Sequence, residues 1–488
     1  MTYTHSYIPL AAVMISLLGT IPITLSKRKP ILRESWTLLI SLGKFALIAS
    51  MLPSVLSGQG FVWTFVDVLP GLPIAFRVDA MGMLFALVAS FLWICTSFFS
   101  FGYLSKLKKH SKTRYYTSFS LAMSATIGVA FAANLLTMYM FYEILSLATY
   151  PLVTHDQDCR VRSAGRKYLS YIVGTSIMFA LPAVIMTYMA VGSLDFTPGG
   201  ILTGKASAPM LALIFCLFIA GFAKASIMPF HAWIPAAMVA PAPVSSFLHG
   251  VAVVKVGVFS ILRVILDIFG PDLLRSLDYG VMLAYFVSFT ILVASLVALT
   301  QDDLKRRLAY STVGQLSYIV LGVALLTPHS TQGGILHIVM HAFGKITLFF
   351  CSGCIYVATH KRSISEMDGL GKQMPLTYAA FFIGALSIIG LPPMGGFISK
   401  WNLLLGTLEA NQLPILVILL ASSLLNAAYF LPIVYRGFFS NGTNEHVNEF
   451  RDVPYYCLVP MCVTALVSFV LFFYHSVFVQ LAKIAAGS

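Results

Sequence analysis

Long apolar runs recur along the whole chain, separated by short segments rich in polar and charged residues. Each run is close to the roughly 20 apolar residues that a helix needs to cross the hydrocarbon core of a bilayer. A transmembrane β-barrel would instead show shorter segments in which apolar and polar residues alternate. The pattern therefore predicts an all-α polytopic membrane protein with about fourteen transmembrane helices, near residues 7–25, 36–56, 80–103, 115–133, 135–153, 168–191, 209–239, 244–266, 279–299, 308–327, 332–358, 376–400, 412–435 and 455–482.

The composition agrees with lipid as the main solvent. Hydrophobic residues make up 58% of the 488 positions and charged residues only 10%, whereas soluble proteins carry about 25% charged residues. So little charge cannot cover a water-facing surface. We expect a single membrane domain over residues 1–488, and the longest polar stretch, from about Arg436 to Pro454, reads as a loop.

The 31 Lys and Arg residues are divided unevenly between the predicted loops. Alternate loops, beginning with the first, hold 21 of them, the opposite loops hold 5, and the remaining 5 lie inside spans. Cytoplasmic loops carry the excess of Lys and Arg in membrane proteins. The split predicts a multi-pass protein of the bacterial cytoplasmic (inner) membrane with both termini on the periplasmic side. It also accounts for the net charge of +13 without a nucleic-acid partner.

Ionisable residues inside the spans are the strongest indication of function. Glu143 is the one carboxylate deep in a span, and it is accompanied by five intramembrane lysines: Lys44, Lys224, Lys255, Lys345 and Lys400. A charge at the bilayer centre costs about 2.5–3.5 kcal/mol on insertion scales, so we expect these residues to pair, titrate or line water. Lys44 has no polar neighbour in its span, and a packing or snorkelling role is the simpler interpretation for it.

Histidines add groups that exchange protons near neutral pH. His337, His341 and Lys345 are spaced i, i+4 and i+8, so they share one helix face. Proton transfer is the favoured interpretation, and a buried polar network that holds helices together is the alternative. No third ligand at suitable spacing suggests a metal site there.

For His231 a structural hydrogen bond and a role in proton entry stay open, and His475 is interpreted as structural.

Two spans are interrupted by proline or glycine, and each carries a lysine. Lys224 precedes Pro229 in one, and Lys400 follows Pro392 and Pro393 in the other. Paired interrupted spans are typical of transporters built from repeats, with the ion path at the breaks. Burial disfavours the charged form of an amine, and a nearby carboxylate favours it. Glu143 and Lys224 are therefore predicted to form a switchable pair, with a static buried ion pair as the alternative.

His249 and Lys255 lie six residues apart, just after a proline-containing segment. They cannot share a face of a regular helix, which has 3.6 residues per turn. Either the two side chains contact different neighbours or the helix is irregular there.

Five segments, taken together and in this order, resemble the antiporter-like subunits of complex I (NADH:quinone oxidoreductase) and of multisubunit Mrp Na⁺/H⁺ antiporters. They are FYEILSLATYPLV, AGFAKASIMPFHAWIPAAMVAPAPVSSFLHGVAVVKVGV, DDLKRRLAYSTVGQLSYI, HIVMHAFGKITLFFCSG and GLPPMGGFISKW. The resemblance covers about residues 75 to 440 and is strongest to the Mrp D-type subunit or a mid-sized complex I-like subunit. It implies two inverted five-helix repeats with discontinuous helices, at about 115–266 and 279–435, flanked by helices over 7–103 and 455–482.

The resemblance also implies roles for individual residues. Glu143 looks like the fifth-helix glutamate that pairs with the seventh-helix lysine, here Lys224, and His249 and Lys255 look like the eighth-helix connection. In the second repeat, the residues that resemble the central axis and its outlet are His337, His341 and Lys345 of the eleventh helix and Lys400 of the twelfth. Some complex I members carry glutamate at the last position, whereas this chain has lysine.

The function expected from these features is proton, or cation/proton, translocation within a hetero-oligomeric membrane complex. One alternative is a proton-pumping subunit of a membrane-bound hydrogenase or another respiratory oxidoreductase. An alternative of another class is a non-pumping membrane scaffold, which would not need the intramembrane charges. The chain has no cysteine cluster for iron–sulfur, no dinucleotide-binding glycine motif and no P-loop, so no cofactor and no metal are predicted, and any oxidoreductase activity would belong to the complex.

Overall fold

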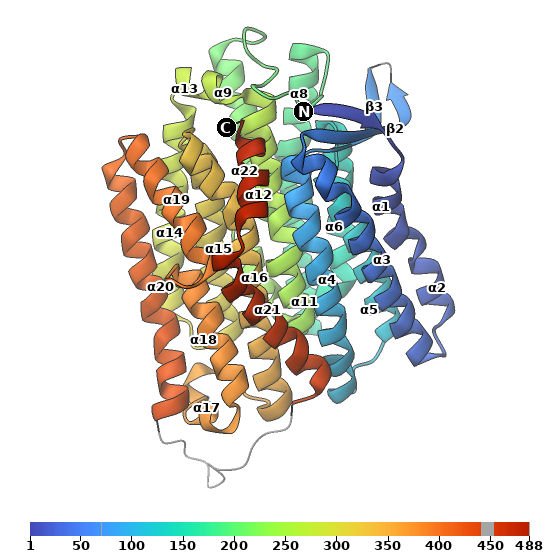
Figure 1. Cartoon of the computed structure of the whole chain (residues 1–488), viewed down its shortest axis with the longest axis vertical. Coiled ribbons are helices and arrows are strands. Elements are labelled where there is room, and N and C mark those ends of the chain that lie inside the picture. Colours follow the sequence, from blue (N-terminus) through green and yellow to red (C-terminus); the bar gives the residue numbers. More distant parts are fainter. Residues whose placement is uncertain (70, 441–452, 488) are drawn as a thin grey trace.

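The computed structural model describes residues 1–69, 71–440 and 453–487. Its helices run side by side along the long axis of the molecule, and both termini lie at the same end (Figure 1). Each predicted span contains described helix, which confirms the all-α polytopic fold. The first half comprises α1 Ile8–Leu18, α2 Thr20–Leu25, α3 Pro30–Leu56, α4 Ala80–Lys106, α5 Lys112–Ala130, α6 Leu135–Val153, α7 Cys159–Thr175, α8 Leu181–Val191, α9 Ala208–Gly221, α10 Trp233–Ala236, α11 Ala242–Ser246 and α12 Val253–Arg263.

The second half is also built of helices. It comprises α13 Pro271–Ser276, α14 Tyr279–Thr300, α15 Leu304–Ala324, α16 Pro328–Thr359, α17 Leu370–Gln373, α18 Pro375–Ile389, α19 Gly395–Glu409, α20 Leu413–Phe439, α21 Tyr455–Phe473 and α22 Ser476–Ala486. The predicted loop from Arg436 to Pro454 begins later than expected, because α20 extends to Phe439; most of that segment lies outside the described residues.

The helices differ in how they meet lipid. Among the described residues, 8 helices are long and apolar enough to cross a membrane, and the apolar part of α16 is wholly buried. The remaining predicted spans are broken into shorter pieces or are less apolar. The helices that carry Glu143, Lys255 and Lys400 belong to this second group, as expected for elements that are shielded from lipid by their neighbours. Lys44 in α3 and Lys345 in α16 lie in helices of the first group.

Two helices break in the middle of the bundle. The first break separates α9 from α10 and contains the short 3₁₀ turn η2 Ala223–Ala225; the second separates α18 from α19. A proline lies in each break, Pro229 in the first and Pro392 in the second, and it prevents the helix from continuing, since it lacks the N–H and clashes with the preceding turn. At the second break, Gly390 has φ +87°, a conformation that glycine adopts without steric cost. The interrupted spans predicted around Lys224 and Lys400 are thus confirmed.

The helix that follows the first break is irregular. A π-helical turn, η4 Phe247–Val251, connects α11 to α12. This turn accommodates residues that a regular α-helix would place on different faces. It decides between the two alternatives for His249 and Lys255 in favour of an irregular helix.

One feature was not predicted from the sequence. A small three-stranded sheet lies at the end of the bundle near the N-terminus (Figure 1), formed by β1 Thr2–His5, β2 Gln59–Leu69 and β3 Leu72–Val78. β1 pairs with β2 in parallel, and β2 pairs with β3 as an antiparallel hairpin. The sheet adds to the all-α fold without entering the bundle.

Candidate functional site

Lys224 lies inside the first break and is fully buried. Its Nζ donates to the carbonyl of Tyr142 on α6 at 2.5 Å and lies 3.1 Å from the centroid of the Tyr142 ring. Glu143, the next residue, is half-buried, and its Oε1 has no hydrogen-bond partner. Among the ion pairs of the described residues, none joins Glu143 to Lys224. The two predicted partners are therefore neighbours without direct ion-pair contact.

Close packing fixes the position of Lys224. The Trp233 indole N–H donates to the carbonyl of Ala223 at 3.0 Å, which anchors the unwound segment from its far side. The helix α12 also packs against this segment, so closely that a Cβ on Gly257 would lie 2.1 Å from the Ala225 nitrogen. Only glycine permits this approach, so the broken helix is wedged between α6 and α12.

Lys255 on α12 connects this region to the central helix. Its Nζ contacts the Nδ1 atom of His341 on α16, and both residues are buried. His249 also faces α16, where its ring lies 4.9 Å from that of Phe349, but neither ring nitrogen has a hydrogen-bond partner. The π-helical turn therefore directs both residues to the same neighbour.

His337 and His341 form the buried centre of the site. Their rings lie 5.8 Å apart and are nearly parallel. His337 is bonded on both sides, through Nδ1 to Ser399 Oγ and through Nε2 to Gln315 Oε1, each at 2.9 Å. His341 uses one nitrogen for Lys255, while its Nε2 has no partner. This arrangement confirms that the two histidines share a helix face.

Lys345 lies on the same face of α16, one turn after His341, but its side chain extends toward α15. Its Nζ donates to the Leu308 carbonyl of α15 at 3.1 Å and lies 5.4 Å from the centroid of the Phe430 ring. No hydrogen bond in the described residues joins it to His341. The i+4 spacing correctly predicted the face, but not the partner, which is the carbonyl of another helix.

Lys400 spans the second break. Although it lies in α19, its Nζ reaches back to the Ile389 carbonyl at the end of α18, at 3.0 Å, and to Ser423 Oγ of α20 at 3.1 Å. The ammonium group also lies 4.7 Å from the centroid of the Tyr318 ring. That ring lies 5.6 Å from the ring of His337. Tyr318 therefore separates Lys400 from the histidines.

Several polar neighbours of the site histidines and of Lys400 were not predicted from the sequence. Gln315, Tyr318, Ser399 and Ser423 are uncharged, and their proximity to the histidines or to Lys400 depends on tertiary packing. His329 was also missed, although its position carries a signal: it continues the i+4 spacing of the α16 face by two turns. It contacts Glu409 at the end of α19, and both side chains are partly exposed.

Three further ionisable residues lie apart from the contacts described above. Lys44 is fully buried and donates to the Met123 carbonyl at 3.2 Å, so it packs within the bundle and does not snorkel. The His475 Nδ1–H donates to the Phe472 carbonyl at 2.8 Å, between α21 and α22. His231 is half-buried beside the ring of Tyr310, 6.2 Å away, and its Nδ1 has no partner.

The ionisable residues of the site form two groups. Glu143 and Lys224 lie at the first break. Lys255, His341 and His337 follow one another toward Lys400, from which the Tyr318 ring separates them. Histidine and lysine side chains can accept and donate protons in turn, and buried ionisable residues of this kind mark ion pathways and proton relays in membrane proteins. No hydrogen bond in the described residues joins Lys224 to Lys255; the two groups are brought near each other by the close packing of α12, which carries Lys255, against the first break.

Comparison with known proteins gives a consistent result. The family model described as "NADH:quinone oxidoreductase/Mrp antiporter, TM" matches residues 132–426. NADH-quinone oxidoreductase subunit N of Desulforudis audaxviator (strain MP104C) is 35% identical over 380 residues, covering 76% of this chain and 74% of that protein. NADH-quinone oxidoreductase subunit M of Rickettsia prowazekii (strain Madrid E) is 32% identical over 403 residues, covering 81% of this chain and 79% of that protein.

Two solved structures share the fold. A chain of the Mrp complex from Dietzia sp. DQ12-45-1b superposes with a TM-score of 0.88 at 22% identity, covering 99% of this chain and 96% of that one. A chain of the membrane-bound sulfane sulfur reductase, an archaeal respiratory membrane complex, gives a TM-score of 0.88 at 24% identity, covering 99% and 97%. At this level of identity the likeness is one of fold.

Proposed function

Because this chain belongs to the NADH:quinone oxidoreductase/Mrp antiporter family, we propose that it translocates protons, or exchanges a cation for protons, as an antiporter-like subunit of a multisubunit membrane complex. The observation that supports this function most directly is the series of buried ionisable residues along α12 and α16. A purely structural membrane protein has no use for so many buried cations, since each is costly to keep away from water.

We propose that the proton path runs from the first break to the second. Glu143 and Lys224 load the proton, and Lys255 passes it to His341 through their direct contact. His337 then delivers it toward Lys400 by way of Ser399, with which it shares a hydrogen bond. In this scheme His249 and Lys345 line the path, and the path lies across the interface of the two predicted repeats.

The outer end of the path is proposed to lie at His329 and Glu409. His329 stands on the same face of α16 as His337, and Glu409 ends α19, the helix that carries Lys400. Gly333, between the two histidines, lets α19 approach closely, because a Cβ there would lie 2.8 Å from the Leu403 nitrogen. The two helices of the site thus reach the surface together.

The orientation that we propose places both termini on the periplasmic side of the bacterial inner membrane. It rests on the 21-to-5 division of the basic residues and the positive-inside rule. An alkaline-phosphatase fusion at the C-terminus should be active and a fluorescent-protein fusion at the same place dark. The reverse pattern would overturn the orientation.

The partners that we propose are other membrane subunits, as in the complexes named for the relatives, and the transported ions are protons with Na⁺ as the candidate counter-ion. Co-purification of the intact complex followed by subunit identification would establish the parent complex. Recovery of the chain alone from mild detergent, with no co-purifying membrane subunit, would contradict this assignment.

Lys255→Met tests the proposed function. Membrane vesicles from a strain that lacks the chain should regain formation of a pH gradient with the wild-type chain and not with this variant, at equal assembly. Lys44→Met is the matched control, because it removes a buried lysine that donates to a single carbonyl away from the path. Wild-type pH gradients with Lys255→Met would contradict the proposed function.

A further inference from the structure

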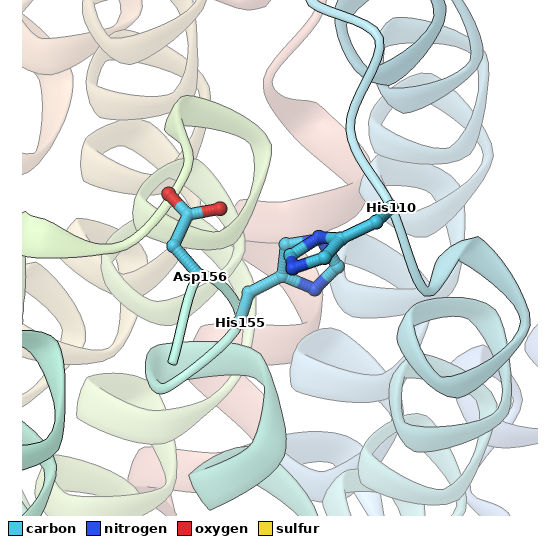
Figure 2. Close-up of side chains that lie close together, drawn as sticks. All are labelled: His110, His155 and Asp156. Atoms are coloured by element: carbon cyan, nitrogen blue, oxygen red, sulfur yellow. The ribbon is translucent and has the colours of Figure 1, made fainter. Parts of the chain in front are cut away.

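A second cluster of ionisable residues lies outside the proposed path. His110 is in the connection between α4 and α5, and His155 and Asp156 are in the turn between α6 and α7. The candidate ligand atoms of these three residues lie within 4.8 Å of one another. Figure 2 shows the two imidazole rings next to each other, with the Asp156 carboxylate turned away from them.

His155 is unusual within this cluster. It is fully buried, and neither of its ring nitrogens has a hydrogen-bond partner. Buried polar atoms are nearly always hydrogen-bonded in proteins, and an exception calls for an explanation. Its nearest ring is that of His110, at a centroid distance of 5.6 Å and an interplanar angle of 90°. One unsatisfied nitrogen of His155 thus lies within 4.8 Å of a ring nitrogen of an exposed histidine on a different connection.

We propose that His110, His155 and Asp156 form a binding site for a divalent transition-metal ion, with Zn²⁺ as the first candidate. Two imidazoles and one carboxylate make up a known type of three-ligand zinc site, in which water occupies the fourth position. Zinc–ligand distances of about 2.0–2.2 Å bring ligand atoms to roughly 3.4 Å from one another. The ligand atoms have to move from separations of up to 4.8 Å to about 3.4 Å. Rotation of the exposed His110 side chain and of the Asp156 carboxylate would provide this movement.

The charged neighbours of the cluster define its selectivity. The Lys109 ammonium contacts both Asp156 oxygens, at 2.8 and 2.7 Å, and Arg114 donates to the His155 carbonyl at 2.8 Å. A carboxylate keeps further lone pairs for a metal while it binds a lysine. With a single carboxylate and two cations nearby, the site is unsuited to Mg²⁺ or Ca²⁺, which are held by several oxygen ligands. It suits ions that bind imidazole, among them Zn²⁺.

Metal binding at this place would join two connections that are otherwise linked by the Lys109–Asp156 ion pair. Lysines lie on both sides of His110: Lys108 and Lys109 in the α4–α5 connection, and Lys112 at the start of α5. Bound zinc should therefore slow cleavage by trypsin in this segment. This readout does not depend on transport, so it can fail while the proposed function holds, and the reverse is also true.

The experiment uses the full-length chain without a polyhistidine tag, purified in detergent. Zn²⁺ is titrated against a chromophoric chelator, and Co²⁺ is added separately to record the visible absorption of a four-coordinate site. We expect one Zn²⁺ per chain, and trypsin protection by Zn²⁺ but not by Mg²⁺. His110→Ala and Asp156→Asn should each weaken Zn²⁺ binding by about 100-fold, since even second-shell changes at metal sites cost 10–100-fold.

His360→Ala is the matched control, because His360 is an exposed histidine next to Lys361, which lines the same surface pocket as Lys109 and Asp156. It should leave Zn²⁺ affinity unchanged. His110 is exposed, so its loss should not disturb folding, and the test stands even if His155→Ala fails to fold. Absence of Zn²⁺ binding, or equal binding by the His110→Ala, Asp156→Asn and control variants, would overturn the proposal.

Discussion

At the first break, Lys224 is part of the unwound segment and donates to a carbonyl of α6, one residue before the carboxylate of Glu143. At the second break, Lys400 belongs to the helix that follows and reaches back to the Ile389 carbonyl and to Ser423. One lysine has an acidic neighbour. The other has a carbonyl, a hydroxyl and the face of Tyr318, with His337 beyond that ring.

The difference indicates that the two breaks have different tasks. A neighbouring carboxylate favours the charged form of a lysine, and the effect weakens as their separation grows, so movement of Glu143 can change the proton affinity of Lys224. Lys400 has no such control among the described residues. In the proposed path, its charge state responds to His337, which lies on the other side of the Tyr318 ring. We infer that the first break is the regulated one and that the second receives and releases the proton.

Removing either lysine should have the largest effect. Lys224→Met and Lys400→Met should each lower proton transport by about 100-fold or more, the range that positioned acid–base groups contribute. Lys44→Met, measured in the same vesicles, should stay near the wild-type rate. If either path lysine behaved like Lys44, the break that it occupies would have no part in transport.

Changes at Glu143 should separate the two breaks. Glu143→Gln keeps the shape of the side chain but removes its charge, so transport should fall by about 10-fold to 100-fold. Glu143→Asp should keep part of the activity, since the charge survives at a shorter reach. Equal rates for the Gln and Asp variants would mean that the charge does not control Lys224, and the distinction between the breaks would be lost.

The histidines should show an intermediate effect. His341→Gln removes the contact with Lys255 and should slow transport by about 10-fold or more, because one acid–base group of the series is lost. His249→Gln should have a smaller effect, since His249 bonds no residue of the path. The initial rate of acidification of the vesicle interior measures both. A larger loss of transport with His249→Gln than with His341→Gln would place His249, and not His341, in the proton path.

Ser423→Ala should have the smallest effect. It removes one of the two hydrogen bonds of Lys400, and a single hydrogen bond contributes about 1 kcal/mol to stability. Thermal unfolding should therefore occur at a slightly lower temperature, while transport stays within about threefold of the wild type. Loss of transport with normal assembly would show that Ser423 itself carries the proton.

The sequence predicted the elements of this fold better than their contacts. Apolar runs located the spans, and the prolines after Lys224 and before Lys400 located the breaks, because both signals are local. The i+4 spacing placed His337 and His341 on one face. What spacing could not supply was the partner across the interface, such as Lys255 for His341 or the Leu308 carbonyl for Lys345.

Non-local contacts explain the other omissions. The pairing of β1 with β2 joins segments on either side of three helices, so no local sequence pattern predicts it. His110 and His155 stand at the ends of different helices, and their proximity depends on how α4 to α7 pack. His329 is a different case. Its spacing from His337 was visible in the sequence, but it was not predicted as a site residue because it lies outside the predicted span.

The central claim is that Glu143 and Lys224 act as proton-transfer groups and are not a structural pair. The double variant Glu143→Gln with Lys224→Met tests it most directly, because it removes both charges and leaves neither one buried alone. Breaking a buried pair by removing one partner is destabilising, whereas replacing both is often tolerated. Formation of a pH gradient in membrane vesicles is measured, with assembly of the complex checked in the same membranes. We predict that the double variant assembles and remains inactive. Recovery of transport in the assembled double variant would contradict the account.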